Sequence, residues 1–134
     1  MILRRTALIA MAGMVLAGIP PVVAKVKQSA PLRMFDSDHD GSLDLQETKN
    51  AALALFDKLD RDKDGTLDRR ELAGRLSIRE FGASDPDHDG SLTKEEYLAV
   101  VELRFRAADP DNDGTLTASE LNTKAGKAVL RLMK

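Results

Sequence analysis

Four acidic segments of equal length recur along this 134-residue chain at short and nearly even intervals. They span residues 36–47, 60–71, 85–96 and 109–120, called loops 1 to 4 below, and each has the pattern Asp-x-Asp-x-Asp-Gly-x-Leu with Glu at position 12. One such segment could occur by chance in an acidic chain. Four of them, with no departure at positions 1, 3, 5, 6 or 12, predict four similar ion-binding loops.

The residue types in these loops suit a hard cation of about the size of calcium. Such an ion takes six to eight oxygen ligands at about 2.3–2.6 Å, and Asp side chains on alternate residues can converge on it. Glycine at position 6 permits the sharp turn, and the longer Glu, at the start of the following helix, reaches back with two oxygens. This is the pattern of an EF-hand loop, with ligands at positions 1, 3, 5, 7, 9 and 12. The predicted metal ligands are Asp36, Asp38, Asp40, Ser42, Asp44, Glu47, Asp60, Asp62, Asp64, Thr66, Asp68, Glu71, Asp85, Asp87, Asp89, Ser91, Thr93, Glu96, Asp109, Asp111, Asp113, Thr115, Thr117 and Glu120.

The short repeat constrains how the loops can pair. The spacers between consecutive loops cover only residues 48–59, 72–84 and 97–108. Each spacer is long enough for one helix but not for an exiting helix, a linker and a new entering helix. A straight helix that fills such a spacer is about 18 Å long, so it places its two loops at opposite ends. Consecutive loops joined by such a helix therefore cannot lie side by side.

The middle spacer differs from the other two. Residues 48–59 and 97–108 lack Pro and Gly and carry apolar residues at helical spacing, whereas residues 72–84 contain Gly74 and Gly82. Ser77 and Glu80 form a capping box that starts a new helix within the middle spacer. We therefore expect this spacer to fold back, so that loop 2 pairs with loop 3 and loop 1 with loop 4. The predicted fold is all-α: a compact helical bundle of four EF-hands that share short connecting helices.

Apolar residues in the spacers predict the core. Pro31 interrupts residues 26–35, so any helix that enters loop 1 should be short, and residues 125–133 should form a terminal helix. Leucine at position 8 should point into the core and bridge to a partner loop. The other predicted core residues are Phe35, Leu55, Phe56, Leu59, Leu76, Ile78, Phe81, Val100, Val101, Leu103 and Phe105.

The amino-terminal segment, residues 1–24, differs from the rest of the chain. Arg4 and Arg5 precede an apolar stretch over residues 7–19, and two prolines and Ala24 follow. This pattern predicts a secretory signal peptide, residues 1–24, and a mature metal-binding domain, residues 25–134, in the periplasm. An uncleaved membrane anchor is the alternative, which the short, proline-broken stretch disfavours. The mature chain has no cysteine and so no disulfides, and bound metal would have to stabilise its small hydrophobic core instead.

The distribution of charge and reactive residues excludes several functions. Of 22 acidic residues, 18 lie at ligand positions, while Lys and Arg are spread without a basic stripe for nucleic acid. His39 and His88 occupy position 4, with no cysteine or second histidine beside either, and no nucleophile–base pair is evident, so we predict no enzyme. Only Met34 and Met133 lie outside the leader, which argues against a methionine-rich groove for target helices. We expect a monomer or weak homodimer, bound to no membrane after cleavage; the sequence identifies no protein partner.

Position 9 bears on the choice between calcium and a lanthanide(III) ion. Loops 1 and 2 have Asp there and thus five carboxylates each, whereas loops 3 and 4 have Thr and four carboxylates each. Each added carboxylate attracts a trivalent ion more than a divalent one. Five carboxylates therefore favour a lanthanide, although many calcium loops also carry Asp at position 9.

Several stretches, read together with the leader and the short repeat, resemble the lanmodulins, which are periplasmic lanthanide-binding EF-hand proteins. These stretches are AALALFDKLDRDKDGTLDRREL, EEYLAVVELRFRAADPDNDGTLTASEL and KAGKAVLRLMK, together with proline at position 2 of loops 3 and 4. The resemblance implies selectivity for lanthanides over calcium, folding on metal binding and the non-sequential pairing of loops. The chain departs from it at Ser37 and Arg61, where proline is expected, and at Thr93 and Thr117, where Asp is expected.

Three functions remain open from the sequence: lanthanide capture, calcium binding as a periplasmic buffer or sensor, and a domain whose metal is purely structural.

Overall fold

Residues 29–134, which the computed structural model describes, form short helices and four two-residue strands. The predicted signal peptide lies outside these residues. The helices are α2 (Ala30–Phe35), α3 (Leu45–Leu59), α4 (Ile78–Ser84), α5 (Lys94–Ala108), α6 (Ala118–Leu121) and α7 (Lys124–Leu130). The strands are β1 (Leu43–Asp44), β2 (Leu67–Asp68), β3 (Ser91–Leu92) and β4 (Thr115–Leu116).

The strands pair the loops out of sequence order. Strand β1 pairs with β4, and β2 pairs with β3, both antiparallel. The position-8 leucines face each other across these ladders, Leu43 opposite Leu116 and Leu67 opposite Leu92, and all four are fully buried. The predicted pairing of loop 2 with loop 3 and of loop 1 with loop 4 is confirmed.

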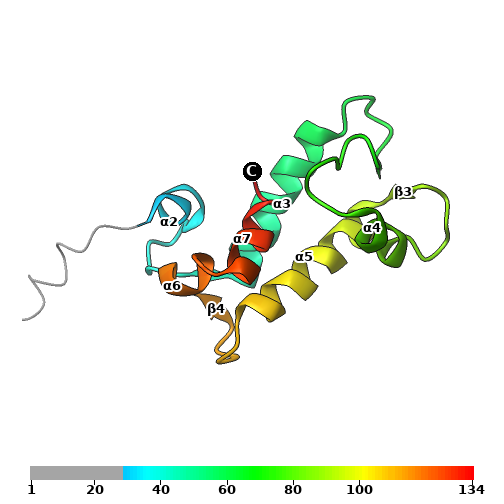
Figure 1. Ribbon diagram of the computed structural model, residues 1–134. Helices are drawn as coiled ribbons and strands as arrows, with labels where there is room; N and C mark the ends of the chain where they lie inside the picture. Colours follow the sequence, from blue (N-terminus) through cyan, green and yellow to red (C-terminus); the bar gives the residue numbers. More distant parts are fainter. Residues whose placement is uncertain (1–28) are drawn as a thin grey trace, which may run out of the picture.

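Helices α3 and α5 connect the two loop pairs. Helix α3 runs from loop 1 to loop 2, and α5 runs from loop 3 to loop 4, so the two helices point in opposite directions and contact each other. The pair of loops 2 and 3 lies at one end of these helices, and the pair of loops 1 and 4 lies at the other (Figure 1). This arrangement follows from the spacing, because each straight helix keeps its two loops apart.

The middle spacer folds back as expected, but its first half is not helical. A series of turns follows Glu71, and Gly74 adopts a left-handed conformation with φ of +82°. Ser77 then caps helix α4: its hydroxyl accepts the Glu80 N–H, and the Glu80 carboxylate accepts the Ser77 N–H. The expectation that every closing glutamate begins a helix is therefore wrong for Glu71, because the left-handed glycine ends the first helical turn.

Two hydrophobic clusters form the core, one behind each loop pair. The cluster at loops 2 and 3 centres on Phe56, which meets Tyr97 edge to face with ring centroids 5.6 Å apart. The cluster at loops 1 and 4 includes Phe105, with Phe35 packed against it. The prediction of burial in the core is wrong for two residues: Ile78 is 74% exposed and Leu103 is 65% exposed. Ile78 is the first residue of α4, and Leu103 lies on the side of α5 opposite its buried face.

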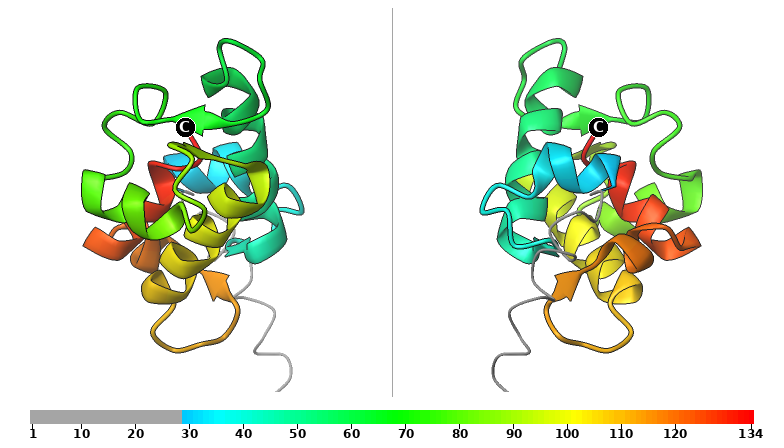
Figure 2. Two further views of the ribbon diagram at one scale, coloured as in Figure 1. Left: turned by 90° about the vertical axis from the view of Figure 1, so that its right-hand side faces the viewer. Right: turned by 90° about the vertical axis from the view of Figure 1, so that its left-hand side faces the viewer.

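The C-terminal segment turns back from loop 4 along α5, toward the other end of the molecule. Helix α7 packs against α5, as both views in Figure 2 show. It begins one residue before the predicted start and gives way to turns after Leu130. Leu132 is fully buried in the cluster behind loops 2 and 3, where its carbonyl oxygen accepts the Tyr97 hydroxyl at 2.8 Å.

Within residues 29–134, none of the helices combines the length and the apolar character that crossing a bilayer requires.

Candidate metal centres

In all four loops, the first aspartate organises the turn. Its side chain is at most 7% exposed, and its two oxygens accept backbone N–H groups from positions 5 and 6. In loop 1, for example, Asp36 accepts Asp40 N–H at 3.1 Å and Gly41 N–H at 2.9 Å. These bonds bend the backbone around one point and fix the carboxylate there.

Positions 5 and 7 bond to each other in every loop. In loop 4, both the N–H and the hydroxyl of Thr115 donate to Oδ1 of Asp113, at 2.9 and 3.1 Å. The equivalent bonds occur in loops 1, 2 and 3. The hydroxyl at position 7 thus donates to the aspartate, and in an EF-hand loop this position offers its backbone carbonyl to the ion.

Positions 9 and 12 form a capping box in every loop. The position-9 side chain accepts the N–H of the closing glutamate, and that glutamate accepts the N–H of position 9. In loop 1, Asp44 Oδ1 accepts Glu47 N–H at 2.7 Å, and Thr93 Oγ1 accepts Glu96 N–H at 3.2 Å in loop 3. Asp and Thr both supply this cap, with the shorter bonds from Asp, and they differ in charge.

Several predicted carboxylate ligands converge within each loop, whereas Asp64, Asp68 and Asp89 lie outside the convergent groups. Carboxylate oxygens of Asp109, Asp111, Asp113 and Glu120 lie within 4.8 Å of one another. Comparable groups form in the other loops: Asp36 with Asp38 and Asp40, Asp38 with Asp44 and Glu47, Asp60 with Asp62 and Glu71, and Asp85 with Asp87 and Glu96. Two oxygens on opposite sides of a calcium-sized ion are separated by about 5 Å. The donor sets therefore fit a hard cation of that size.

Like charges crowd together at these centres. The hydrogen bond between Asp109 and Asp111 raises the pKa of Asp111 to about 6, and the charges of Asp113 and Glu120 act in the same direction. The pKa of Asp87 is also raised, first by its hydrogen bond to Asp85. Two carboxylates that share a proton would repel each other without it. A cation that replaces the proton removes this repulsion, so the pair binds the cation favourably.

The closing glutamate is held differently in the two halves of the sequence. Ser37 N–H donates to Glu47 Oε1 at 2.8 Å in loop 1, and Arg61 N–H donates to Glu71 Oε1 at 3.0 Å in loop 2. Loops 3 and 4 have proline at that position, which has no N–H. Position 2 therefore supplies no backbone donor to Glu96 or Glu120.

Comparison with known families agrees with this geometry. The sequence profile described as "EF hand" matches residues 32–52, 53–77 and 100–123, which together make up just over half of the chain. The chain belongs to the EF-hand family. The matched segments contain loops 1, 2 and 4; loop 3 has the same internal hydrogen bonds and pairs with loop 2. No curated protein matches the chain.

Each EF-hand loop also carries a left-handed residue that the sequence reading did not anticipate. His39, Lys63, His88 and Asn112, all at position 4, have φ between 52° and 60°. Asn and His tolerate this region better than most residues, and Lys63 is the least suited of the four. Both histidines are exposed.

Two features near the EF-hand loops were missed although the sequence carried a signal for each. Each loop has Asp or Thr three residues before its closing Glu, which is the sequence pattern of a capping box. From the sequence, such a box is predicted only in the middle spacer. Charge distribution alone does not distinguish Arg104 from the other basic residues, but Arg104 falls in a helical stripe with Tyr97, Val101 and Ala108. Its side chain is only 11% exposed.

Proposed function

We propose that this EF-hand protein is exported to the periplasm, captures lanthanide(III) ions in its four loops and becomes helical as it does so. The observation that carries the proposal is that carboxylate oxygens converge in every loop. The sequence adds that loops 1 and 2 each have five carboxylates at ligand positions. Excess negative charge in a cage of calcium size favours a trivalent over a divalent ion. The resemblance to the lanmodulins supports the same choice.

Folding on binding follows from the charge distribution. In the absence of ions, 18 carboxylates at ligand positions repel one another, and the raised pKa of Asp111 reflects this crowding. A multivalent ion replaces repulsion with attraction and thereby stabilises the folded loops.

Calcium binding is the second candidate. Loops 3 and 4 carry four carboxylates each, with threonine at position 9, and their donor sets fit calcium as well. A periplasmic calcium buffer needs no lanthanide selectivity. A purely structural metal is the third candidate, and it predicts ions that do not exchange with added metal.

Competition between the two metals tests these candidates. Tyr97 directly follows Glu96 and is the only tyrosine, with no tryptophan present, so its excitation should sensitise terbium bound in loop 3. We expect terbium to fill four sites per chain and to resist millimolar calcium at mildly acidic pH. Ready displacement by calcium would leave calcium binding as the function, and a Tyr97→Phe variant provides the background emission.

Export is tested separately. Protein recovered from the periplasm should begin at Lys25, because the predicted cleavage follows Ala24. Intact mass of the purified protein measures this directly, and a chain that keeps residues 1–24 would support the anchor instead.

A further inference from the structure

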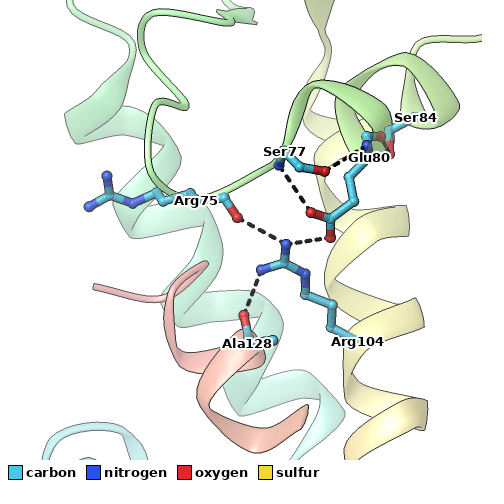
Figure 3. A network of polar contacts seen from close by, with 6 residues as sticks. All are labelled: Arg75, Ser77, Glu80, Ser84, Arg104 and Ala128. Atoms are coloured by element: carbon cyan, nitrogen blue, oxygen red, sulfur yellow. Dashed lines mark hydrogen bonds and ion pairs between the residues drawn. The ribbon is translucent and has the colours of Figure 1, made fainter. Parts of the chain in front are cut away.

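Arg104 makes three strong hydrogen bonds inside the molecule (Figure 3). Its guanidinium donates from Nη1 to the Ala128 carbonyl at 2.7 Å, and from Nη2 to the Arg75 carbonyl at 2.9 Å and to Glu80 Oε1 at 2.7 Å. The side chain is 11% exposed. Charge-assisted bonds in such a sheltered place are stronger than those of surface pairs.

The partners of Arg104 come from the two different loop pairs. Arg75 and Glu80 lie in the spacer between loops 2 and 3, whereas Ala128 lies in α7, which follows loop 4. Glu80 is itself fixed by its capping box with Ser77. The guanidinium is therefore bonded both to the half of the molecule that contains loops 2 and 3 and to the half that contains loops 1 and 4. It loses partners if either half leaves its folded position.

The C-terminal segment makes two further links in the same region. The Tyr97 hydroxyl donates to the Leu132 carbonyl at 2.8 Å, and Arg75 Nη2 donates to the Lys134 carbonyl at 3.2 Å. Both bonds join the end of the segment after loop 4 to residues near loops 2 and 3. The side chain of Leu132 also lies in the cluster behind loops 2 and 3. Apart from it, the two halves have separate hydrophobic clusters, joined through α3 and α5.

We propose that Arg104 couples the two loop pairs, so that ions in loops 1 and 4 raise the affinity of loops 2 and 3. This inference rests on the proposed metal binding. Ions stabilise the folded form of the pair that holds them, and the bonds of Arg104 are complete only when both pairs are folded. Part of the free energy of filling one pair thus appears as affinity at the other, and the coupling must be reciprocal.

A thermodynamic cycle measures this coupling. Glu47→Gln with Glu120→Gln disables loops 1 and 4, and terbium titration then gives the affinity of loops 2 and 3. The same pair of substitutions is made in the Arg104→Met background. Arg106→Met is the matched control, because Arg106 lies on the same helix, its side chain is 71% exposed, and it bonds Glu102 across one helical turn.

In the unmodified background, we expect loss of loops 1 and 4 to weaken loops 2 and 3 by roughly 5- to 150-fold, the usual range of such coupling. In the Arg104→Met background, the factor by which the affinity of loops 2 and 3 falls should be less than about a third of that in the unmodified background. In the Arg106→Met background, this factor should be unchanged. The proposal is overturned if Arg104→Met lowers every affinity but loss of loops 1 and 4 still weakens loops 2 and 3 by the full factor. Arg104 would then be merely structural.

Glu80→Gln provides a second measurement should Arg104→Met not fold when saturated with metal. It removes the ion pair but keeps both carbonyl bonds, so the coupling should fall to an intermediate factor; an unchanged factor overturns the proposal. An unmodified protein that takes up no terbium contradicts metal binding itself, which is a different outcome from four filled sites without coupling.

Discussion

At the scale of the residue, position 9 of each loop combines two roles in one side chain. It caps the following segment by accepting the N–H of the closing glutamate, and it sets the charge of the cage. Because Asp and Thr both supply the cap, exchanging them changes the charge while leaving the local backbone bonds in place.

Thr93→Asp with Thr117→Asp should therefore raise the preference for lanthanides over calcium. One added charge about 4 Å from an ion contributes about 1 kcal/mol per unit of ion charge even in bulk water. A trivalent ion thus gains about fivefold more than a divalent ion at each altered loop. Competition titrations of lanthanum against calcium measure the ratio. Thr93→Ser with Thr117→Ser keeps the cap without the charge and should leave the ratio unchanged; an equal gain for both metals would contradict the argument.

At the scale of the element, the close approach of α7 to α6 depends on one glycine. A Cβ on Gly126 would lie 2.6 Å from the Leu121 Cα and would also clash with the Glu120 carbonyl. Thr123 fixes this approach, since its hydroxyl donates to the Glu120 carbonyl and accepts the Gly126 N–H. The C-terminal segment is thereby attached directly to the residue that closes loop 4.

Gly126→Ala should destabilise the metal-saturated protein by about 1–3 kcal/mol, as overpacking usually does. Gly82→Ala is the matched control, because Gly82 is also helical and a Cβ there meets nothing within 4 Å. That substitution should stabilise the protein by about 0.5–1 kcal/mol, because Ala lowers the conformational entropy of the unfolded chain and has a higher helix propensity than Gly. Chemical denaturation at a fixed free-metal concentration measures both, and similar effects of the two substitutions would show that α7 does not pack so closely on α6.

The ion pair between Arg104 and Glu80 makes stability depend on pH in acid. The capping N–H of Ser77 and the guanidinium of Arg104 lower the pKa of Glu80 to about 2, from 4.5 in an unfolded chain. The unfolded chain therefore takes up the proton first as the pH falls. The stabilisation is complete above about pH 4.5 and is lost as the pH falls through 2. It is modest, because the Glu80 side chain is 47% exposed and screened by solvent.

Glu80→Gln removes this titration, so the variant and the unmodified protein should differ in melting temperature at pH 6 and converge as the pH approaches 2. Ligand carboxylates titrate in both proteins, and the difference between them cancels that contribution. Melting curves of the two proteins at the same total lanthanide concentration across this range supply the test. A constant gap over the whole range is the contrary result.

At the scale of the whole molecule, loop spacing determines most of the architecture, and for that reason the sequence predicted it. Spacers this short prevent consecutive loops from pairing through a straight helix, and Gly74 marks the spacer that turns back. Contacts between distant segments had no comparable signal. The burial of Leu132 against Tyr97 and the bonds of Arg104 depend on where α7 lies, which helical periodicity within one segment does not specify. The roles of the predicted ligands remain predictions.

Tyr97 reports on the state of the whole molecule, because its ring is fully buried in one half and its hydroxyl bonds the C-terminal segment of the other. If ions hold the two halves together, removing them with a chelator should lower the far-ultraviolet helical signal and abolish the near-ultraviolet tyrosine signal. Because the halves are coupled, both signals should return over the same range of added lanthanum. Tyr97→Phe should remove the near-ultraviolet tyrosine band while keeping a metal-dependent helical signal. Full helicity and an ordered tyrosine in chelator would mean that the fold does not depend on the ions, and repulsion among the 18 ligand carboxylates would then be too weak to unfold it.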